Sequence, residues 1–534
     1  MLLRLCLLIL CTPVCYVLIH IARFLSRELF SPLRYMCGPP NASLFFGNFR
    51  EMLNDLEWAT RWRAQFGHTF RIRGVFSISE VYTTDVKALS HILNDNTTYR
   101  RSPVTRDVQQ RLLGNGVLYA EKEDHKRQRR VMNQAFGAAQ IRLLTDVFAK
   151  KATQLREIWA TRLNENGGRI DVTDDLRRMT LDVIGQAGFH YAFDALNEKR
   201  SELNDAFTSL LHSPGSEGFM AVRLVQSTMP ILKLLPLPGS KLVLRTRAIM
   251  DSIGAQIVST TKAALMERAQ TDKVLHERRD LLAVLLKSNL STDLRDYQRM
   301  SDEEVIAQIP TFLLAGHETT SSAVTWALHE LSQNPDVQQQ LREELFTLGT
   351  EEPTMDELNS LRLLERIVRE TLRLHAPVVF LTRMAMQDNI LPLSRPYIDR
   401  DGKEHYNLPI AKGQMMHIPI LAVNTDKKIW GDDALEFKPQ RWDALPEAVN
   451  GIPGVWANLL TFFAGPHACI GFRFSLVEIK VLLFTLLRAF EFDPAVSAAG
   501  IVPKVTGLIQ NPVLRVSDKS SSTFPLILKP YSRE

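Results

Sequence analysis

The spacing of hydrophobic and polar positions changes several times along the chain. Residues 50–66 carry apolar positions at the three-to-four spacing of an amphipathic helix, which packs one face against a core. Residues 68–84 are instead rich in β-branched and aromatic residues, and this pattern predicts a small hairpin. From 122 to about 375 the spacing is overwhelmingly helical. The chain up to residue 375 is therefore predicted to be mostly helix, with an early hairpin.

The last part of the chain mixes strand-like and helix-like patterns. Residues 378–420 are strand-like pieces broken by Pro and Gly, and residues 424–457 are irregular and rich in turn residues. A last long helix is predicted over about 471–490, followed by short strands at 512–516 and 524–529.

No long linker divides the body of the protein. A length of 534 residues would on its own suggest several domains. Helix-rich and sheet-rich parts are interleaved, however, and a packed domain of this kind is built from both. We therefore predict one large α+β domain over residues 35–534, mainly α with smaller β-sheets.

The N-terminus begins with an apolar run, residues 5–22, that carries no formal charge. As a helix, a run of this length would cover about 27 Å, close to the hydrocarbon core of about 30 Å. Arg23, Arg27 and Arg34 follow the run, and the positive-inside rule places such a flank in the cytosol. We therefore predict that residues 1–34 are a single-pass membrane anchor with its flank, and that the body is cytosolic.

Two alternatives concern contacts with the membrane. A cleaved signal peptide is the other interpretation of the N-terminal run, although no clear small-residue cleavage site follows it. The stretch ILKLLPLPGSK, residues 231–241, is apolar, broken by Pro and too short to span. It is either a second, shallow contact with membrane lipid or a buried connection between helices.

Composition and charge narrow the function classes. The chain is 45% hydrophobic and 23% charged, with a net charge of +5, as is ordinary for a globular protein. It has no concentrated basic footprint, so no nucleic-acid partner is expected. Three of the five cysteines lie in the apolar run, which leaves Cys37 and Cys469 for the body. This usage predicts a reducing compartment and no disulfide framework.

Cys469 stands in the segment FFAGPHACIG, residues 462–471, directly before the last predicted helix. One thiolate cannot complete a structural zinc site, and no sequence cue supplies a base for a nucleophilic cysteine. Gly465 and Gly471 let the backbone approach a ligand closely, and a helix N-terminus lowers a thiol pKa. A thiolate held as the sole protein ligand in such a loop suits haem iron, and an inert buried cysteine is the alternative.

This segment resembles the cysteine-loop signature of the cytochrome P-450 family, Phe-x-x-Gly-x-Arg-x-Cys-x-Gly. Phe462, Gly465, Cys469 and Gly471 fall in register, and His467 occupies the position usually held by Arg. The resemblance implies that Cys469 is the axial ligand of the iron of haem b. It also implies that the other four residues bind the cofactor, with His467 donating a hydrogen bond to a haem propionate.

A second match is the Glu-x-x-Arg motif within ERIVRETLRLH, residues 365–375. Glu370 and Arg373 lie three residues apart, so they share one face of a predicted helix. Arg441 stands where the family supplies an additional Arg. By this resemblance the three residues form a buried structural lock that holds the cysteine loop and does not react.

The segment TFLLAGHETTSS, residues 311–322, resembles the oxygen-activation motif on the long central helix of the same family. The small residues Ala315 and Gly316 would let the helix approach the haem and leave room for dioxygen. Glu318 and Thr319 would supply an acid and a hydroxyl for proton delivery, so the resemblance implies that these two residues are catalytic.

Two further arginines match propionate-binding positions of the family. Arg129 fits the Arg of a Trp-x-x-x-Arg motif, and His125 sits where Trp is usual. Arg383, in PVVFLTR, matches an Arg that follows the Glu-x-x-Arg helix. Together the matches cover about residues 38–516 and imply the cytochrome P-450 fold, a single large haem domain behind an N-terminal transmembrane helix.

The resemblance implies a haem-thiolate monooxygenase of the membrane-bound microsomal type found in fungi, with thiolate donation that favours O–O cleavage. The chain has no flavin motif and no Gly-x-Gly-x-x-Gly after a strand, so NADPH would act indirectly. Its electrons would come through an NADPH–cytochrome P-450 reductase of the endoplasmic reticulum membrane, with cytochrome b5 as an optional second donor. Apolar segments such as VVFLT, residues 378–382, favour a lipophilic substrate, and the fungal character favours terpenoid or other secondary-metabolite biosynthesis.

Two other functions remain open at this point. A haem-thiolate isomerase or dehydratase would rearrange an oxygenated substrate without external electrons, and it would not need Glu318 and Thr319. A haem sensor or carrier would bind the cofactor without turnover. Binding of carbon monoxide and consumption of NADPH separate a sensor from an enzyme.

Overall fold

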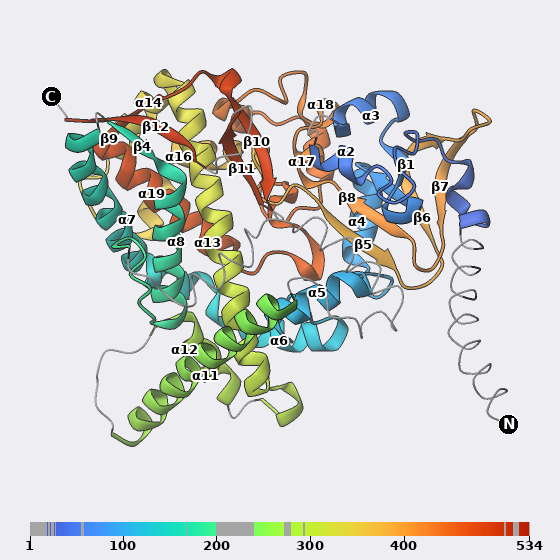
Figure 1. Cartoon of the computed structure of the whole chain (residues 1–534). Helices are drawn as coiled ribbons and strands as arrows, with labels where there is room; N and C mark the ends of the chain where they lie inside the picture. The colour runs from blue at the N-terminus through green and yellow to red at the C-terminus, as the bar shows by residue number, and fades with distance from the viewer. Residues whose placement is uncertain are drawn as a thin grey trace. The chain divides into compact units, whose positions relative to one another are not determined.

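In the computed structural model, helices dominate and the strands form small sheets, which confirms the predicted α+β class (Figure 1). The structure describes residues 19, 22, 26, 28–54, 58–166, 168–198, 240–271, 279–291, 294–506, 509–515 and 523–532.

The chain forms two compact units, each built from segments that are far apart in the sequence. Unit 1 comprises residues 1–105, 217–238 and 380–422, and unit 2 comprises residues 106–216, 239–379 and 423–534. Neither unit is one continuous stretch, so a boundary between them could not have been found as a linker. That residues 35–534 form a single domain stays a prediction.

Unit 1 is built around a five-stranded sheet. Its elements are α2 (Phe49–Asn54), α3 (Trp58–Phe66), β1 (Thr69–Arg73), β2 (Ser79–Thr83), α4 (Val86–Asn94), β3 (Tyr99–Arg100), β5 (Leu381–Ala385), β6 (Asn389–Ile398), β7 (Glu404–Ile410) and β8 (Met415–Ile418), with short 3-10 helices at Pro32–Tyr35 and Val75–Ser77. The strands run in the order β1-β2-β8-β5-β3, and β6 pairs with β7. The predicted hairpin is confirmed as β1 and β2, with Phe70 opposite Tyr82. The helix predicted over 50–66 appears as α2 and α3, and residues 55–57 lie outside the described residues.

Unit 2 holds most of the helices. They are α6 (Lys122–Ala135), α7 (Ala138–Asn166), α8 (Val172–Phe189), α11 (Ser240–Thr271), α12 (Leu281–Leu290), α13 (Asp302–Gln333), α14 (Pro335–Leu345), α15 (Met355–Ser360), α16 (Arg362–Leu374), α18 (Lys427–Trp430) and α19 (Phe472–Ala489). Two helices, α5 (Pro103–Leu113) and α17 (Ile420–Asn424), cross a boundary between the units. The last predicted helix is thus confirmed as α19.

The strands of unit 2 form two small sheets. They are β4 (Arg169–Asp171), β9 (Phe490–Pro494), β10 (Ile501–Thr506), β11 (Ile509–Leu514) and β12 (Pro525–Pro530), and short 3-10 helices lie at Asp296–Gln298, Pro439–Asp443, Glu447–Gly451, Leu460–Phe462, Gly465–His467 and Ala498–Gly500. β10 pairs with β11, and β12 lies between β4 and β9. The predicted strands at 512–516 and 524–529 correspond to β11 and β12. The three-residue strand β4 was not predicted, because its partner is more than 350 residues away in the sequence.

The long helix α13 organises the core of unit 2. It begins with a capping box, in which the Ser301 side chain accepts from the Glu304 backbone N–H at 3.2 Å and the Glu304 carboxylate accepts from the Ser301 N–H at 2.8 Å. α13 packs against α8, α11, α16 and α19, and α7 packs against α8 and α19 (Figure 1). Large side chains such as Phe148, Trp159 and Phe484 are fully buried in this core. Each contributes about 1.5–3 kcal/mol through its burial.

The two segments predicted to contact the membrane lie mostly outside the described residues. Among the described residues, no helix is long and apolar enough to cross a membrane. The predicted anchor at 5–22 lies outside the described residues except for Ile19 and Ala22, and so do residues 231–239 of the second predicted contact. Both therefore stay predictions.

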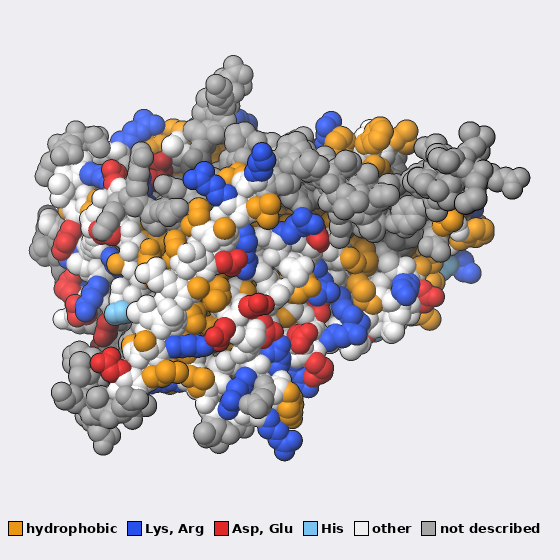
Figure 2. All heavy atoms as spheres, turned by 60° about the horizontal axis from the view of Figure 1, so that its bottom comes forward, with side chains coloured by type: hydrophobic (Ala, Val, Ile, Leu, Met, Phe, Trp, Pro, Cys, Tyr) orange, Lys and Arg blue, Asp and Glu red, His pale blue; other side chains and the backbone are white. Residues whose placement is uncertain are grey.

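The surface of the protein mixes charges of both signs. On the face drawn in Figure 2, Lys and Arg side chains lie among Asp and Glu side chains, with apolar side chains spread between them. This mixture of signs on one face agrees with the small net charge of the whole chain, +5.

Candidate functional site

The cysteine loop of unit 2 is shaped by short backbone hydrogen bonds. The N–H of Cys469 donates to the carbonyl of Phe462 at 2.8 Å, and the N–H of Ala468 donates to that of Gly465 at 3.1 Å. Gly465 has φ +65°, a left-handed conformation that glycine adopts without strain. Gly471 caps the N-terminus of α19 directly after the loop. The loop therefore holds Cys469 by its backbone at the start of a helix, as the sequence predicts.

The surroundings of the Cys469 thiol differ from the prediction in one respect. Burial raises the pKa of Cys469 above its ordinary value of 9.0, and the backbone of Gly471 and the charge of Arg129 oppose this only in part. The prediction of a lowered pKa was wrong, because desolvation of a thiolate outweighs the helix terminus. Cys469 as a residue is nevertheless exposed, so part of it is open to a ligand.

A polar cluster from α6 lies against this loop. Arg129 donates a short hydrogen bond to the carbonyl of Ala468. The rings of His125 and His467 lie 4.0 Å apart between centroids at an angle of 40°. Nε2 of His467 is 3.3 Å from Oε2 of Glu121, and both side chains are only 5% exposed. The structure thus places Arg129 and His467, for which the sequence predicts contacts with a propionate, beside the same loop, together with His125, for which no role was predicted.

Glu121 is the member of this cluster that the sequence analysis missed. It precedes His125 and Arg129 by four and eight residues, which is the spacing of one helical face. That spacing was a readable signal, but no motif of the resemblance includes the position.

Glu370, Arg373 and Arg441 form the predicted lock. Arg373 makes two hydrogen bonds to the Glu370 carboxylate, Nη2 to Oε1 at 2.8 Å and Nε to Oε2 at 2.9 Å. Nε of Arg441 donates to Oε1 of Glu370 at 3.2 Å, and the Glu370 and Arg373 side chains are 0% exposed. Asp433, which was not predicted, pairs with Arg441, and that hydrogen bond holds the pKa of Asp433 at about 2.

A chain of hydrogen bonds links this lock to the cysteine loop. Nη1 of Arg373 donates to the carbonyl of Asn424 at 3.1 Å, and the Asn424 side chain accepts from the backbone N–H of Leu460 at 3.0 Å. The hydroxyl of Thr461 donates to the carbonyl of Leu372 at 2.7 Å. Leu460 and Thr461 lead into Phe462, whose carbonyl holds Cys469. The contacts are those that a lock on the cysteine loop requires.

The motif on α13 has two faces. Ala315 is exposed and Thr319 is half-exposed one turn later, and the Thr319 hydroxyl donates to the carbonyl of Ala315 at 2.6 Å. Glu318 is buried on another face, where Oε2 lies 3.4 Å from Nε of Arg177 on α8. Nε2 of His317 is also 3.4 Å from Oε1 of Glu318. Thr319 therefore lies on the open side of the helix, and Glu318 is held against α8.

Gly316, Phe462 and Arg383 are placed as follows. A Cβ on Gly316 would lie 3.0 Å from the Ile184 side chain on α8, so a larger residue would press on that side chain. Phe462 is buried beside Trp456, with ring centroids 5.6 Å apart. Arg383 lies on β5 of unit 1, where Nη1 donates to the carbonyl of Thr382 at 2.9 Å. For these residues the predicted contacts with a cofactor stay predictions.

The donor set fits haem b. The exposed Cys469 would supply a single sulfur ligand to the haem iron. Arg129 and His467 flank the loop and offer donors suited to carboxylates such as propionates. The small side chain of Ala315 leaves the open face of α13 accessible.

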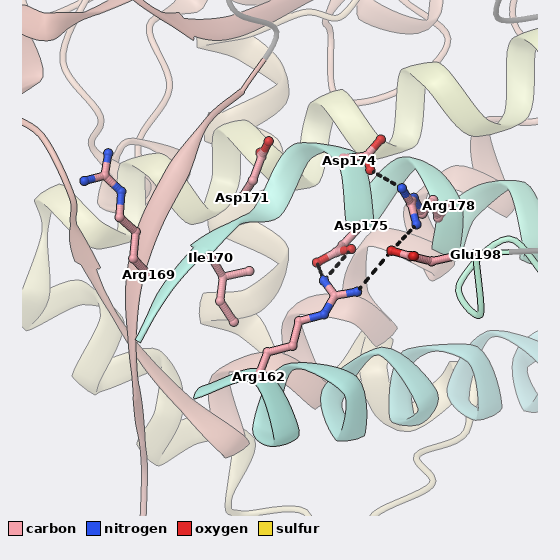
Figure 3. A pocket seen from close by; sticks show the side chains of 8 residues that line it. All are labelled: Arg162, Arg169, Ile170, Asp171, Asp174, Asp175, Arg178 and Glu198. Atoms are coloured by element: carbon pink, nitrogen blue, oxygen red, sulfur yellow. Dashed lines mark hydrogen bonds and ion pairs between the residues drawn. The ribbon is translucent and has the colours of Figure 1, made fainter. Parts of the chain in front are cut away.

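Unit 2 also has a hollow lined by charged residues, away from the motifs described above. It has a volume of about 260 Å³ and is lined by Arg162, Arg169, Ile170, Asp171, Asp174, Asp175, Arg178 and Glu198 (Figure 3). Arg162 pairs with Asp175 at 2.8 Å, and Arg178 pairs with Asp174 at 2.8 Å and with Glu198 at 3.0 Å. These pairs neutralise one another between α7 and α8, so we assign no chemistry to this hollow.

Comparisons with known proteins agree with this geometry. A family model described as "Cytochrome P450" matches residues 38–514. The chain is 45% identical to "Cytochrome P450 monooxygenase 205" of Postia placenta, over 94% of this chain and 93% of the relative. It is 36% identical to "Cytochrome P450 monooxygenase claO" of Ampulloclitocybe clavipes, over 91% and 90%. It is also 36% identical to "Ganoderic acid synthetase CYP5150L8" of Ganoderma lucidum, over 88% and 89%.

Proposed function

This chain belongs to the cytochrome P450 family of haem-b oxidoreductases, and we propose that it is a monooxygenase that hydroxylates a lipophilic small molecule with electrons from an NADPH-dependent reductase. The observation that carries the proposal is the exposed residue Cys469, held by a glycine loop at the start of α19 and flanked by Arg129. When bound, haem b supplies the redox chemistry of dioxygen, and a thiolate ligand favours O–O cleavage.

The protein residues provide position and protons. The Phe462 carbonyl fixes the backbone of Cys469, and the Glu370 lock braces the segment that leads into it. Thr319 offers a hydroxyl on the accessible face of α13, and its hydrogen bond to Ala315 sets the orientation of that hydroxyl. Glu318 is held by Arg177 on the adjoining face and is the acid from which Thr319 is resupplied with protons.

A reductase partner is proposed from the family arrangement and from exposed basic residues. Lys122, Lys126 and Arg130 are exposed on α6, and Arg473 is exposed in the first turn of α19. These cations stand on the two helices that carry the cysteine-loop cluster. They would attract an acidic surface on the electron donor and raise the association rate. Binding of the reductase should therefore weaken with increasing salt.

Location at the endoplasmic reticulum membrane, with a cytosolic body, is proposed from the N-terminus. Besides the apolar run at 5–22, the part of unit 1 that comes directly after this run exposes large hydrophobic side chains, among them Phe30 at 83% and Leu44 at 78%. Exposed apolar groups of this kind favour contact with lipid.

The substrate class is proposed as a terpenoid or another fungal secondary metabolite. Support comes from the fungal relatives, one of which is named for ganoderic acid synthesis, and from the apolar segment at 378–382. The test is co-expression with a fungal NADPH–cytochrome P450 reductase and a panel of terpenoid scaffolds under isotopically heavy O2.

The expected result is a product that carries one heavy oxygen atom and forms only with both reductase and NADPH. A product that forms without reductase and without heavy oxygen would contradict a monooxygenase and favour an isomerase or dehydratase. Oxidation only of compounds outside the terpenoid panel would contradict the substrate class alone.

A further inference from the structure

One face of α6 presents a line of polar residues to the cysteine loop. Glu121, His125 and Arg129 are spaced four residues apart, and each has a partner in the loop. Glu121 contacts His467, the His125 ring lies against the His467 ring at an angle of 40°, and Arg129 donates to the Ala468 carbonyl. His125 is 3% exposed, so this contact is shielded from water.

The two departures from the family pattern meet in this cluster. His125 stands where Trp is usual and His467 where Arg is usual, and the structure places their ring centroids only 4.0 Å apart. An Arg presents a charged planar fork with five N–H donors, so it offers a donor in most side-chain orientations. A His presents two distinct nitrogens, so its use as a donor depends on how the ring is turned. The replacement of Arg by His therefore creates a need for an orienting neighbour.

Glu121 is the neighbour that can orient His467, although its own carboxylate loses contact with water there. Its carboxylate is buried, and a buried carboxylate destabilises a protein unless a partner offsets the loss of water. Oε2 lies 3.3 Å from Nε2 of His467, which restrains one end of the ring while His125 restrains its face. Residues that orient such groups without touching the metal often change affinity about 10-fold or more.

We infer that Glu121 is a positioning residue that acts through His467: it holds the ring that the family resemblance assigns to a haem carboxylate, and Glu121, His125 and His467 act as one coupled unit. The inference rests on the proposed function, because the carboxylates are those of haem b. It predicts that the effects of changing these residues are not independent.

The experiment measures haem release from the purified holoprotein to an excess of apomyoglobin, together with the reduction potential of the iron. The Glu121→Ala variant should release haem about 10-fold faster than the unchanged protein. Glu121→Gln should move the potential to more positive values, because a buried negative charge that favours the oxidised state is removed. Glu123, on the same helix with an 89% exposed side chain, provides the matched controls Glu123→Ala and Glu123→Gln, which should change neither quantity.

A double-mutant cycle tests the coupling. In a His467→Ala background, Glu121→Ala should not speed haem release further, because the residue through which it acts is gone. If either Ala variant does not fold, Glu121→Gln and His467→Phe serve in the same cycle. If the double variant released haem at a rate that is the product of the two single effects, the residues would act independently and the inference would be overturned. A Glu121 variant that releases haem no faster than its Glu123 control would overturn it as well. Absence of the carbon monoxide band at about 450 nm from the reduced, unchanged protein would instead contradict the proposed function, so the two failures are distinguishable.

Discussion

At the residue scale, Thr319 presents a hydroxyl on the accessible side of α13. Replacing it by Ala should uncouple oxygen consumption from product formation, because proton delivery is disturbed while binding is not. NADPH would still be consumed, and hydrogen peroxide would replace much of the hydroxylated product. The measurement is the ratio of product to NADPH consumed in a reconstituted system with reductase.

The matched control is Thr319→Ser, which keeps the hydroxyl and its hydrogen bond to the Ala315 carbonyl. It should keep most of the coupling that Thr319→Ala loses. Equal coupling in the Ala variant and the unchanged protein would remove Thr319 from the proposed mechanism.

At the scale of elements, Glu370 joins α16 to the segment around Pro439–Asp443. Glu370→Ala would leave Arg373 fully buried without its carboxylate, and loss of one partner of a buried pair costs about 3–5 kcal/mol. We expect little folded holoprotein, measured as haem content per purified protein. Glu343→Ala, at an exposed position on α14, should leave haem content unchanged. Normal haem content in Glu370→Ala would show that the lock is dispensable.

Glu478 places a carboxyl group inside the packing of α13 and α19. It is 0% exposed, and burial raises its pKa well above the ordinary value of 4.5, against a smaller opposing effect of the Thr320 hydroxyl. Between pH 4.5 and the raised pKa the folded state binds more protons than the unfolded state, so this group lowers stability as pH rises. Below pH 4.5 both states are protonated and the penalty vanishes.

Glu478→Gln removes this titration and keeps the shape of the side chain. The variant should gain stability relative to the unchanged protein as pH is raised from 5 to 7.5, measured by thermal unfolding of both proteins at each pH. The unchanged protein is its own control at pH 5, where the difference should be smallest. A variant whose stability relative to the unchanged protein does not rise between pH 5 and pH 7.5 would contradict the neutral state assigned to Glu478.

How far these elements could be predicted differs from case to case. Glu370, Arg373 and Arg441 were predictable, because spacing and motif together place them on facing segments. Strand β4 was not, since its pairing with β12 depends on chain segments that sequence periodicity does not connect. The pKa of Cys469 was misjudged because the helix terminus is visible in the sequence and the desolvation of the thiol is not. Glu121 was missed because its proposed role depends on contact with the His467 ring, which is more than 340 residues away in the sequence.

At the scale of the whole molecule, the proposed topology places residues 35–534 in the cytosol. Three Asn-x-Ser/Thr sequons, at Asn41, Asn96 and Asn289, report on this in the native host. Asn289 is a poor reporter, because it is buried and its side chain pairs with the backbone of Met300 at 2.9 Å and 2.7 Å. Asn41 is exposed and Asn96 half-exposed, so these two are the sites to examine.

We expect no glycan on Asn41 or Asn96, measured as unchanged gel mobility after deglycosylation. A glycan on either residue would place the body in the lumen. Removal of residues 2–34 should leave a haem-binding protein, and its remaining sedimentation with membranes tests whether 231–241 contacts lipid. Complete release would exclude that second contact.

The central claim is that the Cys469 thiolate is the iron ligand, and the carbon monoxide spectrum of the reduced protein tests it most directly. The unchanged protein should show an absorption band at about 450 nm, as expected for thiolate-ligated haem. Cys469→Ser should abolish that band, because a serine oxygen does not reproduce thiolate donation. Persistence of the band in Cys469→Ser would contradict the assignment of the ligand and, with it, the account of the site.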